Sequence, residues 1–257
     1  MEFTREKQLC TLLGILVLFP ALCASTFTAS RATYYGSPDG YGTRSGACGF
    51  GEYGRVVNNG YVSAVSRALY KDGAGCGACY KVRCKNPHLC SYDGVDIVVT
   101  DYGEGDRTDF ILGPRAFKKL ALPNIDKKLL SYGVVEVEYK RISCKYPGYK
   151  DKVTYKINEN SNYPYYLALS VLYVSGQNDI TAVELWQEDT KQWKPMRKAY
   201  GAVWDMANPP TSSGPITLRF QATTSLGYTY WVRSTNAIPK VWKAGAAYEA
   251  TAKLITK

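Results

Sequence analysis

The stretch Val98-Val-Thr-Asp-Tyr-Gly-Glu-Gly-Asp-Arg-Thr-Asp-Phe-Ile-Leu-Gly-Pro-Arg-Ala-Phe117 decides how this chain is organised. It begins as a β-branched apolar run, breaks into a loop rich in Gly and Asp, and returns to an apolar segment where Pro114 can open a helix. Four acids crowd the loop: Asp101, Glu104, Asp106 and Asp109. Hydrolysis of a glycan needs two carboxylates in a defined geometry, so the loop predicts either such a pair or a surface that only binds.

The first 24 residues have the pattern of a secretory signal peptide. Arg5 and Lys7 precede the apolar run Leu12–Phe19, which is followed by Pro20 and by small residues up to Ala24. The run is too short to span a bilayer comfortably, and the alternative is an N-terminal anchor. Because no second apolar run approaches membrane length, we expect a soluble, secreted protein whose 257 residues allow two domains.

Six cysteines remain once Cys10 and Cys23 are assigned to the signal or its edge: Cys48, Cys76, Cys79, Cys84, Cys90 and Cys144. In an oxidising compartment six cysteines predict three disulfides, and spacing alone leaves fifteen pairings open. The alternative is a zinc site, since Cys76-Gly-Ala-Cys79 has ligand spacing. Without a second such pair or any paired histidine, we expect no metal, and nothing in the sequence implies a cofactor.

The formal net charge of +10 favours an acidic partner. Acidic polysaccharide, anionic membrane and nucleic acid all fit this charge, but the chain has no tight Lys/Arg block and no nucleic-acid motif. We therefore expect an acidic glycan as the partner, with plain solubility as the alternative explanation.

Short strand-like segments separated by turn residues predict an all-β protein with two domains. Residues 25–146 are rich in Gly, Asn and Asp turns, and residues 133–142 alternate cleanly between apolar and polar positions. Residues 147–152 form a predicted linker. Residues 153–257 contain a series of strand candidates with Asn, Gly, Ser and Pro between them, which is typical of an antiparallel β-sandwich. Within the two domains, the strand candidates are 78–82, 96–100, 153–157, 167–173, 180–186, 216–220 and 229–233.

Five segments, in order along nearly the whole mature chain, resemble plant expansins. They are Ala32-Thr-Tyr-Tyr-Gly36, Gly46-Ala-Cys-Gly-Phe-Gly51, Gly73-Ala-Gly-Cys-Gly-Ala-Cys79, Val99-Thr-Asp101 and Gly201-Ala-Val-Trp204. Finer details, such as Asp101-Tyr-Gly-Glu-Gly-Asp106 and Gly176-Gln-Asn-Asp-Ile-Thr-Ala-Val-Glu184, resemble the expansin-like B subfamily. The resemblance implies a six-stranded double-psi β-barrel, as in family 45 endoglucanases, followed by an immunoglobulin-like β-sandwich that binds carbohydrate. It also implies the disulfides Cys48–Cys76, Cys79–Cys144 and Cys84–Cys90.

Whether the protein can be catalytic depends on the acidic residues of the groove. Expansins have a His-Phe-Asp motif, and the resemblance places Asp109 at its His position and Ile111 at its Asp position. Isoleucine cannot transfer a proton, so the paired acid is absent, and Asp101 matches the other groove aspartate. Asp109 is the alternative acid, because in a strand it would share a face with position 111, and a turn-capping role is the alternative for Asp101. The only histidine, His88, excludes a Ser-His-Asp triad unless it acts alone, and it is expected to be simply solvated.

Aromatic residues are the predicted sugar contacts. Thr33, Tyr35 and Tyr102 match or adjoin groove positions of the family, with ordinary barrel packing as the alternative. In the second domain the resemblance points to a flat platform made by Tyr165, Tyr166 and Trp204. Planar rings suit a crystalline glucan because their apolar faces match the C–H faces of sugars. The alternative for this platform is a contact between the two domains.

The resemblance therefore predicts a monomeric, secreted protein of the plant cell wall that binds cellulose together with xyloglucan or other matrix glucans, and possible pectin binding follows from the charge. It is expected to loosen or remodel the wall without hydrolysis. Two alternatives remain open. One is a weak β-glucan endohydrolase that uses Asp101 with Asp109, and the other is an extracellular signalling or defence protein whose barrel binds a peptide or oligosaccharide.

Overall fold

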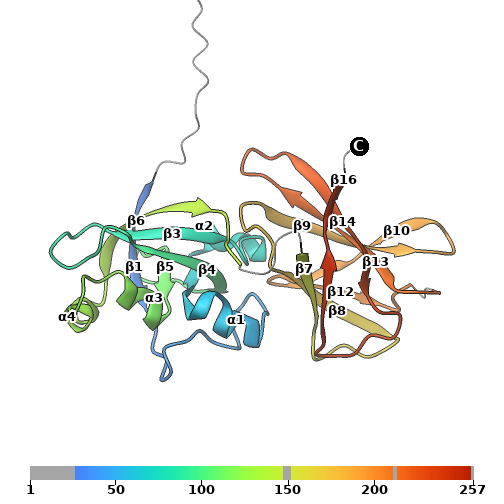
Figure 1. The fold of residues 1–257 in the computed structure, drawn as a ribbon, viewed down its shortest axis with the longest axis horizontal. Coiled ribbons are helices and arrows are strands. Elements are labelled where there is room, and N and C mark those ends of the chain that lie inside the picture. Colours follow the sequence, from blue (N-terminus) through green and yellow to red (C-terminus); the bar gives the residue numbers. More distant parts are fainter. Residues whose placement is uncertain (1–26, 147–151, 211–212, 256–257) are drawn as a thin grey trace, which may run out of the picture.

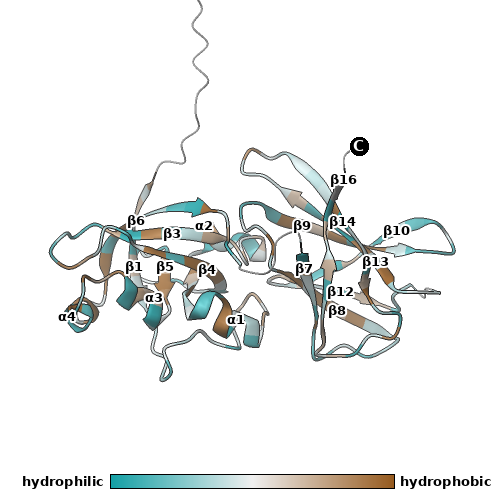
Figure 2. Cartoon of the chain, in the orientation of Figure 1, coloured by the Kyte–Doolittle hydropathy of each residue, from teal (hydrophilic) through white to brown (hydrophobic). Residues whose placement is uncertain are grey.

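The computed structural model describes residues 27–146, 152–210 and 213–255. The predicted signal peptide (1–24) and all but the last residue of the predicted linker (147–152) lie outside the described residues. The chain folds into two lobes placed side by side, with the N-terminal half, blue to green in Figure 1, in one lobe and the C-terminal half, yellow to red, in the other. Hydrophobic segments lie mainly along the strands, and the connecting loops are mostly hydrophilic (Figure 2).

The first lobe is a closed six-stranded barrel in the order β1-β5-β2-β4-β3-β6. Strands β1 and β5, and also β2 and β4, run parallel, whereas the other neighbours are antiparallel. Large apolar side chains such as Phe110, Leu112 and Ile97 are fully buried inside it. The strands are β1 (Thr28–Tyr34), β2 (Val62–Val65), β3 (Cys79–Cys84), β4 (Val95–Tyr102), β5 (Phe110–Leu112) and β6 (Val135–Ile142).

Short helices connect the barrel strands. Pro114 opens α3 at its first turn, where the missing N–H of proline costs no hydrogen bond, and Phe117 of this helix is fully buried against the barrel. The elements are α1 (Glu52–Val56), η1 (Val57–Gly60), α2 (Arg67–Tyr70), η2 (Lys71–Gly73), α3 (Pro114–Lys119) and α4 (Asp126–Ser131).

The second lobe packs two five-stranded antiparallel sheets face to face, in the orders β10-β9-β13-β14-β16 and β11-β12-β8-β7-β15. Its core includes Tyr155, Leu169, Leu185 and Leu218, all fully buried. The strands are β7 (Lys152–Ile157), β8 (Tyr166–Leu172), β9 (Asp179–Gln187), β10 (Gln192–Pro195), β11 (Arg197–Tyr200), β12 (Val203–Ala207), β13 (Ile216–Thr223), β14 (Thr229–Ile238), β15 (Ala247–Thr251) and β16 (Lys253–Ile255). The predicted all-β class, a six-stranded barrel followed by a β-sandwich, is confirmed.

All three disulfides lie in the first lobe or at its exit: Cys48–Cys76, Cys79–Cys144 and Cys84–Cys90. These are the pairs that the resemblance implies. The sandwich has no disulfide among the described residues and rests on its own apolar core.

The two lobes meet through a polar and close-packed joint. Asp179 at the start of β9 forms ion pairs with Lys71 (2.9 Å) and Arg141 (2.7 Å) of the barrel. The backbone N–H of Ala202 donates to the carbonyl of Cys48 at 3.0 Å. A β-carbon added to Gly73 would lie 2.1 Å from the carbonyl oxygen of Gly201, so the two backbones approach each other as only glycine permits.

Candidate functional site

One row of residues crosses four neighbouring strands of the barrel. Thr33 of β1 is paired with Ile111 of β5, Ile111 with Ala64 of β2, and Ala64 with Asp101 of β4. Residues paired across neighbouring strands point to the same face, and each strand adds about 4.8 Å. The α-carbons of Asp101 and Ile111 are therefore about 10 Å apart, with Ala64 between them. The row has one carboxylate, Asp101, at one end, and Ala64, Ile111 and Thr33 are its other members.

Asp101 is held by the loop that crosses in front of it. Its Oδ1 accepts hydrogen bonds from the backbone N–H of Ala47 (2.6 Å) and of Tyr102 (2.8 Å). The loop is pressed close, since a β-carbon on Gly46 would lie 2.6 Å from the carbonyl oxygen of Thr100. Among the described residues Oδ2 accepts no hydrogen bond, so the side chain caps a turn with one oxygen and has the other available for a ligand.

Three tyrosines surround this carboxylate. Burial, together with the negative charges of Asp101 and Asp39, raises the pKa of Tyr35 to about 12. Burial and the charge of Asp101 also raise the pKa of Tyr70, whose hydroxyl donates to the carbonyl of Ala47 at 3.2 Å. The ring centroid of Tyr102 lies 5.1 Å from that of Tyr70, and Tyr102 is 39% exposed. All three remain neutral phenols at physiological pH and can hydrogen-bond or stack on sugar rings.

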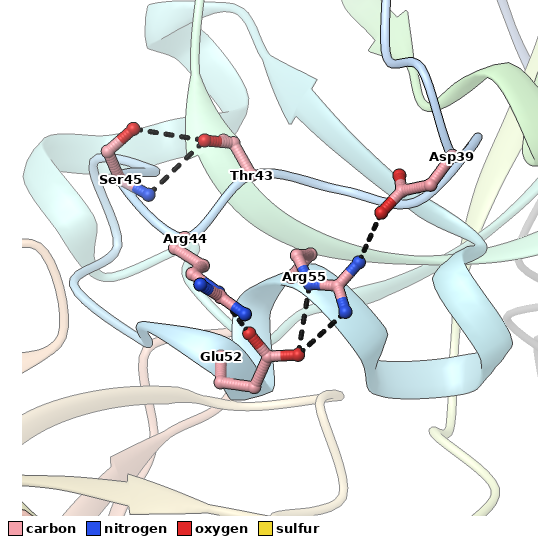
Figure 3. Close-up of polar contacts among 6 residues, drawn as sticks. All are labelled: Asp39, Thr43, Arg44, Ser45, Glu52 and Arg55. Atoms are coloured by element: carbon pink, nitrogen blue, oxygen red, sulfur yellow. Dashed lines mark hydrogen bonds and ion pairs between the residues drawn. The ribbon is translucent and has the colours of Figure 1, made fainter.

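A network of ion pairs braces the loop that leads to Ala47 (Figure 3). Glu52 of α1 accepts from Arg55 (2.9 Å) and also pairs with Arg44, while Arg55 reaches Asp39 at 2.6 Å. The hydrogen bonds from Arg55 and Arg44 lower the pKa of the Glu52 carboxyl group. The pKa of the Asp39 carboxyl group is lowered mainly by hydrogen bonds from the backbone N–H of Tyr41 and the hydroxyl of Ser37, and further by the charge of Arg55. The loop from residue 39 to residue 45 is thus tied to α1, which steadies the backbone N–H that binds Asp101.

Asp109 is occupied by structural bonds. Its Oδ2 accepts from the hydroxyl of Ser30 and its Oδ1 from the hydroxyl of Ser66, both at 2.7 Å. Burial raises the pKa values of Tyr80 and Tyr139, and the charge of Asp109 adds to both, whereas the charge of Asp101 adds to the raised pKa values of Tyr35 and Tyr70. The two acids therefore face different neighbours. Thr33 lies at the far end of the row, and its hydroxyl donates to the carbonyl of Gly133 at 2.8 Å.

Two exposed tyrosines of the second lobe lie in the sheet β11-β12-β8-β7-β15 or its connections, one directly before β8 and one at the end of β11. Tyr165 is 64% exposed, and Tyr200, which sequence reasoning did not single out, is 52% exposed. Tyr166 is half-buried and donates to Oδ2 of Asp205 at 2.8 Å. Asp205 is buried and also bound by Arg197 at 2.6 and 2.9 Å, and these bonds lower the pKa of its carboxyl group.

Trp204 does not present its ring to solvent. It is 6% exposed and packs in the sandwich core beside Leu169, with Lys198 over the ring at 5.8 Å. It also lines a small cavity at the joint with Gly73 of the barrel. This burial does not fit the predicted platform role, and the alternative reading as a contact between the domains describes Trp204 better.

The carboxylate of the barrel and the tyrosines of the sandwich are connected by residues 47–49. Ala47 binds Asp101, and two residues later a β-carbon on Gly49 would lie 2.7 Å from the ring of Tyr200. Asp101, the three barrel tyrosines and Tyr200 thus lie along one path across the joint. The described residues contain no group of three or more His, Cys, Asp or Glu that could hold a metal, and no helix among them is long and apolar enough to cross a membrane.

Comparison with known proteins gives a family for this arrangement. Residues 153–239 match the Expansin C-terminal domain and residues 62–139 match a family described as lytic transglycolase. The chain is 55% identical to Expansin-like B1 of Arabidopsis thaliana over 92% of this chain and 93% of that protein. The chain belongs to the expansin superfamily. It most resembles expansin-like B members, and Expansin-like B1 of Oryza sativa subsp. japonica is 45% identical over 92% of this chain and 91% of that protein.

A solved structure with the same architecture is the expansin of Clavibacter michiganensis, in a mutant form in complex with cellohexaose. It superposes with a TM-score of 0.63 over 87% of this chain and 95% of that chain. At 22% sequence identity the likeness shows that this expansin-like chain has the fold of that protein.

Proposed function

We propose that this expansin-like protein is secreted to the plant cell wall, where it binds cellulose together with xyloglucan or other matrix glucans and loosens their contacts without hydrolysis. The proposal includes cleavage of a signal peptide near residue 24 and a division into a barrel domain (25–146), a linker (147–152) and a sandwich domain (153–257). The protein acts as a monomer and uses no cofactor.

The observation that carries the proposal is the continuous path from Asp101 to Tyr200. Tyr35, Tyr70 and Tyr102 surround the carboxylate, and residues 47–49 extend this surface to the sandwich. Neutral phenols and one hydrogen-bond acceptor suit a neutral sugar chain, because rings cover the C–H faces while Asp101 accepts from a hydroxyl. The relative solved with cellohexaose supports a β-glucan as the ligand.

The row through Asp101 argues for binding rather than cleavage. An inverting hydrolase places two carboxyl groups about 6.5–9.5 Å apart, and a retaining one about 5–5.5 Å apart. The position that would supply the second group in this row is Ile111, and Asp109 is committed to Ser30 and Ser66. A single carboxyl group cannot supply both the general acid that protonates the leaving group and the base or nucleophile that completes hydrolysis. We therefore propose that the protein competes with the non-covalent contacts between wall polymers instead.

The test is creep of a heat-inactivated plant wall strip under constant load at acid pH, with the purified protein and its Asp101→Ala variant. We expect extension that is lost in the variant, while cellulose still retains both proteins. A matched control is Asp93→Ala, which removes an exposed carboxyl group outside the groove.

Extension without any new reducing ends on soluble β-glucan supports the proposal. Release of reducing ends that stops in Asp109→Asn would replace it with a weak endohydrolase. Absence of both extension and cellulose retention would point to an extracellular signalling or defence protein, whose activity would survive Tyr165→Ala combined with Tyr200→Ala.

A further inference from the structure

The outer face of the sheet β10-β9-β13-β14-β16 carries a strip of aromatic and basic side chains that the proposed function does not use. Along β9 and β13, Val183, Leu185, Leu218 and Phe220 are buried in the core. The alternate residues point to the opposite face, because side chains alternate along a strand. On this face lie Glu184, Trp186, Trp193, Arg219, Trp231 and Arg233.

The side chains of this strip are stacked in a fixed order. The rings of Trp186 and Trp193 have centroids 5.2 Å apart. The guanidinium of Arg219 lies 4.3 Å from the ring centroid of Trp193 and 4.2 Å from that of Trp231. Glu184 holds Arg219 in place with contacts of 2.5 and 2.6 Å. The three half-buried rings therefore form a pre-ordered surface that crosses four strands, or about 14 Å.

The same face carries two cations, Arg233 and Lys253, that form no ion pair with any of the described residues. Arg233 is exposed and its guanidinium lies 5.6 Å from the ring of Trp193. It is paired across the sheet with Lys253 of β16, which is also exposed. Neither cation has a carboxylate within ion-pair distance among the described residues, whereas Glu184 is already neutralised by Arg219. The face thus combines stacking rings with two adjacent unpaired cations.

We propose that this face binds an acidic polysaccharide built from uronic acids, and we define it as the Trp193 face: Trp186, Trp193, Trp231, Arg233 and Lys253. The rings cover the C–H faces of successive sugars, while Arg233 and Lys253 bind their carboxylates. A neutral glucan would leave both cations without a partner. This site is distinct from the Asp101–Tyr200 surface, since Tyr165, Tyr166 and Tyr200 belong to the other sheet or its connections.

The test measures the affinity of the purified protein for de-esterified polygalacturonate, with fully methyl-esterified polymer as the neutral counterpart. We expect Arg233→Gln to weaken binding several-fold and Trp193→Ala to weaken it about tenfold, the loss expected when a ring stacked on a cation and a sugar is removed. Arg233→Lys restores most of the affinity. Binding of the native protein also falls as salt is raised, because the cations are exposed.

The matched control is Lys85→Gln, which removes one exposed positive charge from the barrel. If Lys85→Gln weakens binding as much as Arg233→Gln, the attraction is a property of the net charge and the Trp193 face is not a site. Equal affinity for the methyl-esterified polymer, unchanged by Arg233→Gln, would also overturn the proposal. Arg233 is exposed, so its variants test the site even if Trp193→Ala fails to fold. Retention of Arg233→Gln on cellulose separates this outcome from failure of the proposed function.

Discussion

Replacing Asp109 by alanine tests whether this acid stabilises the barrel or takes part in the reaction. The carboxylate accepts two hydroxyl bonds of 2.7 Å, one from Ser30 on β1 and one from Ser66 before α2. Its backbone continues the same connections, because its N–H donates to the carbonyl of Arg31 and its carbonyl accepts from the N–H of Ser66. Asp109 therefore joins β1, β5 and the start of α2 at one point.

The expected loss of stability follows from the two side-chain hydrogen bonds of Asp109. A hydrogen bond to a charged group contributes about 1.5–3 kcal/mol to stability. Asp109 is partly exposed, so the lower part of that range applies to each bond. We expect Asp109→Ala to lower the free energy of unfolding of the barrel by about 3–4 kcal/mol, and Asp109→Asn, which keeps the shape and one acceptor oxygen, to lower it by less.

The assay is urea unfolding under non-reducing conditions, followed by two probes. All five tryptophans lie at or beyond Trp186, so their fluorescence reports the sandwich, whereas far-ultraviolet circular dichroism reports both domains. We expect the variant to shift the dichroism transition and to leave the tryptophan transition almost unchanged. Folded Asp109→Ala protein should still extend wall strips. The structural role would be refuted if Asp109→Ala unfolds with a free energy within about 0.5 kcal/mol of the native value but no longer extends wall strips or releases reducing ends. Asp109 would then act directly on the substrate.

Four further substitutions test the site and its pH dependence. Trp204→Ala should lower the unfolding free energy of the sandwich by about 3–5 kcal/mol, since it empties a buried site, whereas Tyr200→Ala should leave stability within about 0.5 kcal/mol and reduce cellulose retention in a pull-down. Tyr35 has a folded pKa of about 12 against about 10 when unfolded, so its contribution is complete below pH 10 and is lost as pH rises towards 12; Tyr35→Phe should flatten the measured fall in unfolding free energy over that interval. The pKa of Asp205 is lowered by Arg197, so its contribution is present above the unfolded value near 4 and is lost as pH falls through the folded value; Arg197→Gln should therefore move acid unfolding, followed by tryptophan fluorescence, to higher pH.

Long strands with a clear pattern were predictable from the sequence. The alternation over residues 133–142 contains β6 (Val135–Ile142), and the candidate at 180–186 lies inside β9 (Asp179–Gln187). Strands β1 and β5 were not predicted, because Thr-Ala-Ser-Arg-Ala-Thr-Tyr has no apolar alternation and β5 has only three residues. Both strands form because they pair in parallel with each other and close the barrel. A local sequence pattern does not indicate partners that are far away in the sequence.

The site was less predictable than the fold, as the register shift between β11 and β12 illustrates for Tyr200 and Trp204. Lys198 and Tyr200 are two residues apart, so simple alternation places them on the same face. The ladder between β11 and β12 shifts between these two residues, pairing Lys198 with Trp204 but Tyr200 with Val203. The shift turns Tyr200 outward while Trp204 points into the core. The motif Gly201-Ala-Val-Trp204 led to the tryptophan, although the exposed ring directly precedes it.

The joint between the lobes fixes the relative positions of the residues that would contact a bound glucan. Asp179 binds Lys71 and Arg141 of the barrel, and the loop that carries Ala47 and Cys48 is tied to Cys76 by a disulfide and to Ala202 by a backbone hydrogen bond. Asp101 and Tyr200 therefore keep their separation without help from a ligand. A sugar chain that contacts both meets a surface that is already ordered, so little of the binding free energy is spent on arranging the domains. Such a surface can compete with the contacts of one glucan chain to its neighbours, which requires no proton transfer and hence no second acid beside Asp101.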